Sequence, residues 1–231
     1  MKRFLIACFV LFGATLHLRA QSCLGVTMKA GMGFELLNYN AKDKLTSRLV
    51  YTVKDVSNDN GTLVMKMEVQ SFDAKDKPQM SNSYQCRCKG NELMVDMASL
   101  MAAQDNPMMK NAKLAFTSND LTYGDSYTVG TTLKDASLKG SGMMDGGINM
   151  TYGLSLTNRK VAGKESITVP SGTYDAYKIT ADMEVATKAI VNVAFDFQTV
   201  SYRTPNVLWD LKTETYRKDK LIAYSVLSKV F

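Results

Sequence analysis

Apolar and polar residues alternate in several long segments of this sequence. The segment TLVMKMEVQS, residues 62–71, carries apolar side chains at alternate positions, with Lys66, Glu68 and Gln70 between or after them. The segment TYDAYKITADMEV, residues 173–185, repeats the pattern. Because neighbouring side chains of a β-strand point to opposite faces, this alternation predicts the strands of a sheet with one buried face.

Three similar polar phrases separate such strands. YNAKDKL begins at Tyr39, FDAKDKP at Phe72 and YRKDKL at Tyr216. Each lies between two alternating segments, and Asp is one of the few residues that tolerate the left-handed conformation of a tight turn. We therefore expect the three phrases to be hairpin tips with their charges in solvent.

Residues 97–111 depart from the strand pattern. Met97, Leu100 and Met101 have helical spacing, and Pro107 ends the pattern. We therefore expect a mainly β fold with one domain at residues 21–231. It is a strongly curved antiparallel sheet, a half-barrel or open barrel of about ten strands, with one short helix near residues 97–105.

The first twenty residues have the order of a secretory signal. Lys2 and Arg3 precede an apolar run from Phe4 to Leu16, and a short polar stretch ends at Ala20. The run is shorter than the ~20 residues that span a bilayer as a helix. We therefore expect residues 1–20 to be a signal peptide and the chain to be exported, without a transmembrane span.

Charge and histidine content exclude several classes of function. Removing residues 1–20 takes Lys2, Arg3 and Arg19 from the 28 cations and nothing from the 22 anions, which leaves a net charge of +3. So mild a bias requires no nucleic-acid partner. The only histidine, His17, leaves with the signal, so histidine-dependent catalysis is excluded and the commonest metal ligand is missing. We expect no cofactor, no metal and no catalytic residue.

Three cysteines, Cys23, Cys86 and Cys88, remain in an oxidising setting. Cys86 and Cys88 lie two positions apart on one strand, where their side chains run parallel at the outer edge of disulfide geometry. We therefore expect Cys23 to pair with one of them, with Cys88 favoured over Cys86. The remaining cysteine is expected to be a buried, inert thiol.

Cys23 also allows a lipoprotein interpretation. AQSC, residues 20–23, is a degenerate lipobox with alanine where leucine is usual. His17 and Arg19 separate it from the apolar run, which favours ordinary cleavage after Ala20 over lipidation of Cys23.

The methionines indicate an adaptable apolar surface. Fourteen of the 15 methionines lie beyond the predicted signal. Unbranched thioether side chains fill irregular cores and also line adaptable binding grooves. We expect core packing for most of them, and an apolar groove drawn from Met65, Met67, Met97, Met101, Tyr177 and Met183.

Paired carboxylates are the one enzyme class that the composition leaves open, because glycoside cleavage needs two acids and no histidine. Asp175, Glu184, Asp196 and Asp210 lie on predicted strands. The sequence does not bring two of them together, and surface carboxylates are the commoner arrangement. A carboxylate-based hydrolase is therefore a remote alternative.

Three segments carry a family resemblance: GMGFELLNYNAKDKL from Gly31, NRKVAGKESITVPSGTYDAYKIT from Asn158 and KTETYRKDKLIAYSVLSK from Lys212. With a cysteine soon after the signal, they resemble the TapB-like group of exported proteins, which is related to a larger domain-of-unknown-function family. The resemblance implies a Gram-negative envelope protein of the periplasm or outer membrane. It also implies a curved sheet similar to the half-barrels of the lipoprotein carriers LolA and LolB, and it brings no catalytic residue.

These observations favour a non-enzymatic envelope protein. Its curved sheet is expected to bind an apolar ligand, a lipid, or a lipidated or polypeptide partner in its concavity. The alternative is a structural or assembly component that contacts envelope proteins through strand edges or hairpin tips.

The expected disulfide sets the thiol count of the mature protein. After denaturation without reductant, one free thiol is expected, because two of the three remaining cysteines are bonded to each other. A thiol-reactive chromophore, applied before and after reduction, measures this number. Three free thiols before reduction would contradict the bridge.

Overall fold

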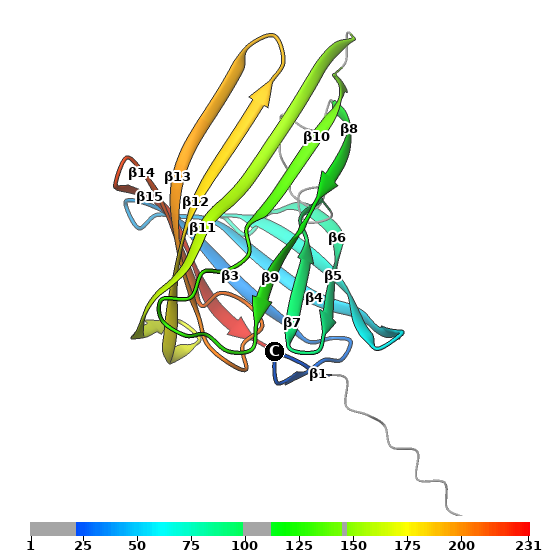
Figure 1. Ribbon diagram of the computed structural model, residues 1–231. Coiled ribbons are helices and arrows are strands. Elements are labelled where there is room, and N and C mark those ends of the chain that lie inside the picture. Colours follow the sequence, from blue (N-terminus) through cyan, green and yellow to red (C-terminus); the bar gives the residue numbers. More distant parts are fainter. Residues whose placement is uncertain (1–21, 99–111, 145–146) are drawn as a thin grey trace, which may run out of the picture.

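The computed structural model describes residues 22–98, 112–144 and 147–231. In this part of the chain, thirteen strands form one antiparallel sheet and two short strands form a separate pair. The sheet curls into a nearly closed, barrel-like shape (Figure 1). The first seven strands are β1 (Ser22–Cys23), β2 (Val26–Thr27), β3 (Gly33–Asn40), β4 (Leu45–Asp59), β5 (Thr62–Asp73), β6 (Pro78–Lys89) and β7 (Glu92–Asp96). The others are β8 (Ala112–Ser118), β9 (Asp120–Gly124), β10 (Ala136–Met144), β11 (Ile148–Val169), β12 (Gly172–Lys188), β13 (Asn192–Arg203), β14 (Lys212–Arg217) and β15 (Lys220–Val230).

The predicted mainly β fold, with a single curved antiparallel sheet, is confirmed. The sheet has thirteen strands rather than about ten. Strands such as β7 and β9 have only five residues each, too few to show a clear alternation in sequence. Of the helix expected near residues 97–105, only Met97 and Ala98 lie within the described residues, and both are helical.

Two other expectations are a signal peptide at residues 1–20 and the absence of a transmembrane span. The predicted signal peptide, residues 1–20, lies outside the described residues. Among the residues that are described, no helix combines the length and the apolar character needed to cross a lipid bilayer.

The three polar phrases form hairpin tips, as predicted. Asp43, Asp76 and Asp219 have φ angles of 55°, 63° and 60°, in the left-handed region that Asp tolerates. The first two tips share a further device: an Asx side chain accepts hydrogen bonds from two backbone N–H groups of the turn. Asn40 and Asp73 are the two acceptors.

The sheet is nearly closed because one stretch of chain serves both of its edges. β8 pairs with β10 at one end of the strand order, and β9 pairs with β7 at the other. Only Asn119 separates β8 from β9. The Asn119 backbone N–H donates to the carbonyl of Ser137 at 3.1 Å, and its side-chain amide donates to the carbonyl of Asp135 at 3.0 Å. The chain therefore bends here and passes from one end of the sheet to the other.

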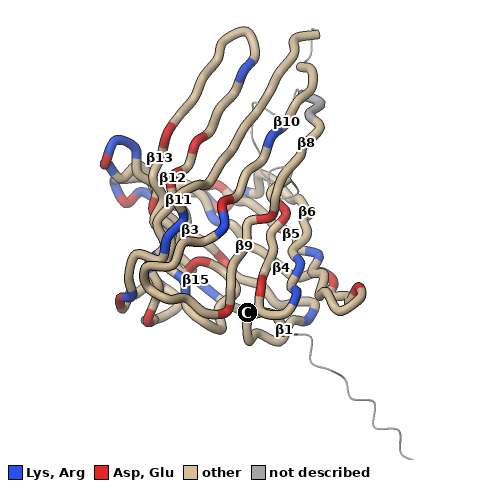
Figure 2. The backbone as a smooth tube through the Cα atoms, viewed as in Figure 1, with Lys and Arg blue, Asp and Glu red and all other residues tan. Residues whose placement is uncertain are grey.

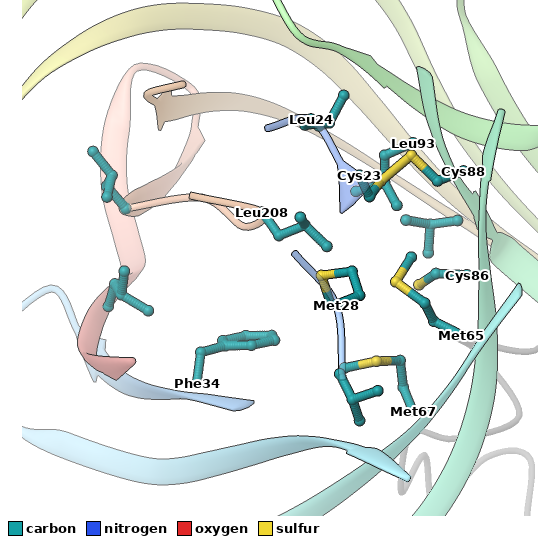
Figure 3. Packing of buried hydrophobic residues seen from close by; sticks show 14 of the residues in the cluster. Cys23, Leu24, Met28, Phe34, Met65, Met67, Cys86, Cys88, Leu93 and Leu208 are labelled. Atoms are coloured by element: carbon teal, nitrogen blue, oxygen red, sulfur yellow. A yellow bond between two sulfur atoms is a disulfide. The ribbon is translucent and has the colours of Figure 1, made fainter. Parts of the chain in front are cut away.

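The lower half of the barrel, around β3–β7, is filled by side chains (Figure 3). The N-terminal segment supplies Cys23 and Met28, and the loop between β13 and β14 supplies Leu208 and Trp209. Met65 and Met67 of β5 pack against these residues and are 0% and 1% exposed. An apolar cavity of about 60 Å³ remains here, which has room for a few atoms and not for a long apolar ligand.

A disulfide fastens the N-terminal segment to the sheet. Cys23 is bonded to Cys88, the pairing that the sequence favoured, with Cα atoms 5.7 Å apart. Cys86 is a free, buried thiol whose pKa is raised by burial, so it is held protonated and unreactive. Because the Cys23 sulfur is in the disulfide, it is not available for thioether lipidation in this form of the protein.

The buried tyrosines predict a loss of stability at alkaline pH. Burial raises the pKa of Tyr51, whose ring stacks on Phe34 at 4.4 Å, to about 12. The unfolded chain releases this proton near pH 10 and the folded chain near pH 12. The contribution of Tyr51 to the free energy of unfolding is therefore complete below pH 10 and is lost as the pH rises from 10 to 12.

Urea unfolding at pH 8, 10 and 11.5 measures this loss. Tyr51→Phe is expected to make the decline above pH 10 shallower, since the substituted ring does not titrate. The decline is expected to persist in part, because burial also raises the pKa of Tyr84. An unchanged pH dependence in the Tyr51→Phe variant would contradict the assignment.

Candidate functional site: an open apolar face

Strands β11, β12 and β13 carry apolar cross-strand rows on one face. Leu154 of β11 lies opposite Val185 of β12, which lies opposite Phe195 of β13. The next row consists of Leu156, Met183 and Phe197. Val193 lies on the same face two residues before Phe195. We call this set the upper apolar face: Leu154, Leu156, Met183, Val185, Val193, Phe195 and Phe197.

The opposite face of the same strands is polar. One row there consists of Ser155, Glu184 and Asp196, and the next of Thr157, Asp182 and Gln198. Strands with one apolar and one polar face are typical of an antiparallel sheet that buries a single side. The apolar side faces the barrel interior, since Leu154, Leu156 and Val185 pack against a buried cluster that we call the upper cluster: Met97, Ala136, Leu138 and Tyr152. Leu121 of β9 packs against both this cluster and the lower core.

Burial of this surface falls steadily from β10 toward β13. Leu138 of β10 and Tyr152 of β11 are 1% and 8% exposed, whereas Phe195 is 38% exposed and Val193 is 39% exposed. The buried end is packed closely: a Cβ atom at Gly140 would lie 2.6 Å from the Phe116 ring, so glycine lets that ring rest on β10. The β13 end of the face is therefore open.

A cation and a hollow lie at the open end. The Arg217 guanidinium, from the turn between β14 and β15, lies 4.9 Å from the centre of the Phe195 ring. A hollow of about 590 Å³ adjoins this contact on the polar face of the strands: its lining includes Ser155, Glu184 and Asp196, together with Arg217, Lys218 and Asp219. Met183, Phe195 and Phe197 also border this hollow, so it lies next to the open end of the apolar face but is not part of that face.

A buried polar centre separates the upper cluster from the lower core along β11. Arg203 of β13 is 2% exposed, forms an ion pair with Asp210 at 2.6 Å and donates to the carbonyl of Leu208. Its guanidinium lies 3.8 Å from the centre of the Tyr123 ring, and that of Arg159, which is 3% exposed, lies 5.4 Å away. Burial raises the pKa of Tyr123, so its hydroxyl stays protonated although both guanidinium groups lie near its ring.

Arg159 connects three parts of the barrel. Its guanidinium donates to the carbonyl of Lys134, just before β10, and to the carbonyl of Thr122 in β9, at 3.1 Å for the second. Among the described residues, no carboxylate forms an ion pair with it. Arg159 therefore ties β9 and the segment just before β10 to β11, beneath the upper apolar face.

The structure distributes the residues of the predicted apolar groove over several places. Met65 and Met67 lie in the lower core, and Met97 lies in the upper cluster. The ring of Tyr177 packs against Tyr127 at 5.5 Å, and Met183 belongs to the upper apolar face. Met101 lies outside the described residues. The five that are described do not line one common surface.

Sequence reasoning missed the residues that make the open end of the face. Val193, Phe195 and Phe197 alternate with Ala194 and Asp196, which was a readable signal for a strand with one apolar side. It missed Arg159 as well, because Asn158 forms a β-bulge with a φ of 52° that shifts the register between Thr157 and Lys160.

The acidic candidates lie in three different settings. Glu184 and Asp196 are directly opposite each other on the polar face, and both are exposed. Asp210 is paired with Arg203, and Asp175 lies 3.7 Å from the Lys164 ammonium. Within the described part of the chain, no group of three or more His, Cys, Asp or Glu residues is arranged to hold a metal ion.

Comparison with known proteins identifies a matching protein family and similar solved structures. A family model described as DUF3108-like matches residues 29–227. The fold is similar to that of a protein from Bacteroides fragilis described as exported, with a YmcC-like fold, at a TM-score of 0.68 and 19% identity. It is also similar to a protein from Parabacteroides distasonis described as a lipoprotein, at a TM-score of 0.69 and 20% identity. Each match covers 88% of this chain and 96% of the other. A search among curated proteins found no match.

The burial gradient predicts two different costs along one row. Leu138→Ala is expected to lower the free energy of unfolding by about 2–5 kcal/mol, because it leaves a cavity in a closed cluster. Phe195→Ser is expected to cost less than about 1 kcal/mol, because the ring is already partly in water. Chemical denaturation of both variants measures the difference. Equal large losses would show that the β13 end is closed.

Proposed function

Because the chain belongs to the DUF3108-like family, whose model matches most of its length, we propose that it is a non-enzymatic, exported envelope protein that binds an apolar ligand on the upper apolar face. Within the family we assign it to the TapB-like group, on the three segments that carry that resemblance. Structural neighbours described as exported and as a lipoprotein support the export of this chain.

The observation that carries the proposal is the open β13 end of an otherwise buried apolar face. Phe195 is 38% exposed and Val193 is 39% exposed, next to rows that are closed at β10. Keeping aromatic and branched side chains in water is unfavourable, by about 25 cal/mol for each Å² of apolar surface that a ligand would cover. An acyl chain laid across the ends of the rows would cover Phe195, Phe197 and Met183 together.

The lower half of the barrel supports the upper face as the binding surface. The lower interior holds a cavity of only about 60 Å³, lined by residues such as Met28, Phe34 and Trp209. An extended hydrocarbon chain needs a longer groove than that. Ligand binding is therefore assigned to the upper face, where apolar side chains remain exposed.

The disulfide bears on how the protein is held in the envelope. With its sulfur bonded to Cys88, Cys23 carries no thioether-linked lipid in this form. We therefore favour a protein that moves in the periplasm, or that reaches the outer membrane through its partners, over one anchored by Cys23.

An assembly role through protein contacts is the second candidate. The observation that favours it is the upper part of β13, where backbone groups on one side of the strand have no neighbouring strand within the part of the chain that the structure describes. This role is compatible with ligand binding, because it uses the backbone edge rather than the apolar face.

Fluorescence of N-phenyl-1-naphthylamine, which brightens in apolar surroundings, tests the proposed function. The mature protein is expected to bind this probe, and Phe195→Ser is expected to weaken binding by about tenfold, in line with the loss of one buried aromatic side chain. Asp196→Ser, on the polar face of the same strand, serves as the matched control. No binding by the unsubstituted protein, or equal weakening by both variants, would contradict the proposal.

A further inference from the structure

The upper part of β13 is an open sheet edge. β13 pairs with β12 along its whole length, from Asn192 to Arg203. On its other side, β14 pairs only with residues 198–202 and then turns back at Arg217. On the side of β14, residues 192–197 therefore have no neighbouring strand among the described residues. In Figure 1 the β12–β13 hairpin rises well beyond β14 and β15.

The direction of the free backbone groups follows from the paired part of the strand. The carbonyl of Tyr202 accepts from the Leu211 N–H at 2.8 Å, on the side of β14. Backbone groups of successive residues in a strand point alternately to either side. The register between β12 and β13 has no bulge, so the N–H and C=O groups of Asn192, Ala194 and Asp196 point to the open side.

This edge has few of the features by which sheet proteins prevent unwanted pairing, and Asp196 is its one charged side chain. Natural edges are blocked by lysine, proline, bulges or a covering segment. Residues 192–197, NVAFDF, contain no lysine and no proline, and their register is regular. The hairpin tip beside them is apolar as well: Ile190 is 80% exposed and Val191 is 67% exposed.

The side chains of the edge define the chemistry of a partner strand. On one face, Val193, Phe195 and Phe197 would meet apolar side chains. On the other face, Asp196 lies opposite Glu184, and no described residue forms an ion pair with either. Figure 2 shows acidic residues in red on both β12 and β13. A cationic side chain opposite Asp196 would relieve the repulsion between the two carboxylates.

We propose that an extended polypeptide with alternating apolar and cationic residues adds to the sheet as a strand along Asn192–Phe197. Its backbone would pair with Asn192, Ala194 and Asp196, its apolar side chains would extend the rows of the upper apolar face, and its cations would face Asp196 and Glu184. A second copy of this chain fits less well, because the same edge carries one anion and no cation. The inference does not depend on the binding of an apolar ligand.

Peptide binding to edge variants of the mature protein tests the inference. The probe is a short capped peptide in which valine and lysine alternate. One control peptide has the same composition with the two residue types in separate blocks, and another has glutamate in place of lysine. Ala194→Pro removes one outward N–H without touching the pairs with β12, and Ala194→Val is the matched variant that keeps it.

Calorimetric titration is expected to show binding of the alternating lysine peptide and a preference of at least about tenfold over both controls. Ala194→Pro is expected to weaken this binding at least about tenfold, and Ala194→Val less than about threefold. Asp196→Lys is expected to transfer the preference to the glutamate peptide. Unchanged far-ultraviolet circular dichroism and urea midpoints of the Ala194 variants would show that they remain folded.

Three results would overturn the inference. Equal affinities of the two Ala194 variants would show that the backbone edge is not used. Absence of binding by all peptides would remove the site. A dimer in light scattering that Ala194→Pro dissociates would assign the edge to a second copy of the chain. The naphthylamine experiment is independent of all three, so failure of ligand binding and failure of strand addition are distinguishable.

Discussion

Closure of the curled sheet depends on the stretch around Asn119, where the chain stops pairing with β10 and begins to pair with β7. A strand edge that is left open exposes unpaired N–H and C=O groups, and a sheet that closes on itself removes that cost. Here one bent stretch, β8 to β9, serves both ends of a thirteen-stranded sheet. The lower half closes around a filled interior. In the upper half the same closure is not completed on the side of β13, because β14 is half as long as its neighbour.

The two buried arginines mark the boundary between these halves. Taking a guanidinium out of water costs several kcal/mol, and a buried ion pair seldom returns more than it costs. Arg203 has a carboxylate partner, whereas Arg159 has two backbone carbonyls. Their contribution comes from where they lie: each guanidinium is near the ring of Tyr123, and Arg159 joins β11 to β9 and to the segment before β10. Apolar residues at these points would merge the two clusters into one continuous core and would leave the carbonyls of Thr122 and Lys134 without these donors.

Much of the fold could be predicted from the sequence because its causes are local. Period-two alternation in β5 and β12 and the Asp residues of the hairpin tips each act within a few residues. The two-residue spacing of Cys86 and Cys88 is also local, and it directed the expected bridge to Cys23, which lies 65 positions from Cys88. The open site could not be predicted in the same way. Val193 and Phe195 alternate visibly, but their exposure depends on the length of β14, which lies on the other side of a loop. Arg159 sits at a bulge, where an extra residue shifts the strand by one and breaks the very periodicity on which the prediction rested.

The open apolar face and the open edge have one origin, the excess length of β12 and β13 over β14. A strand added at Asn192–Phe197 would place its own side chains beside Phe195 and Phe197, and would continue each apolar row by one position. It would also occupy the space near Arg217, whose guanidinium now lies against Phe195. A ligand on the face and a polypeptide at the edge would then touch the same rings. Binding of either one would therefore change the affinity for the other. The two changes in binding free energy would be equal, because coupling between two sites is reciprocal.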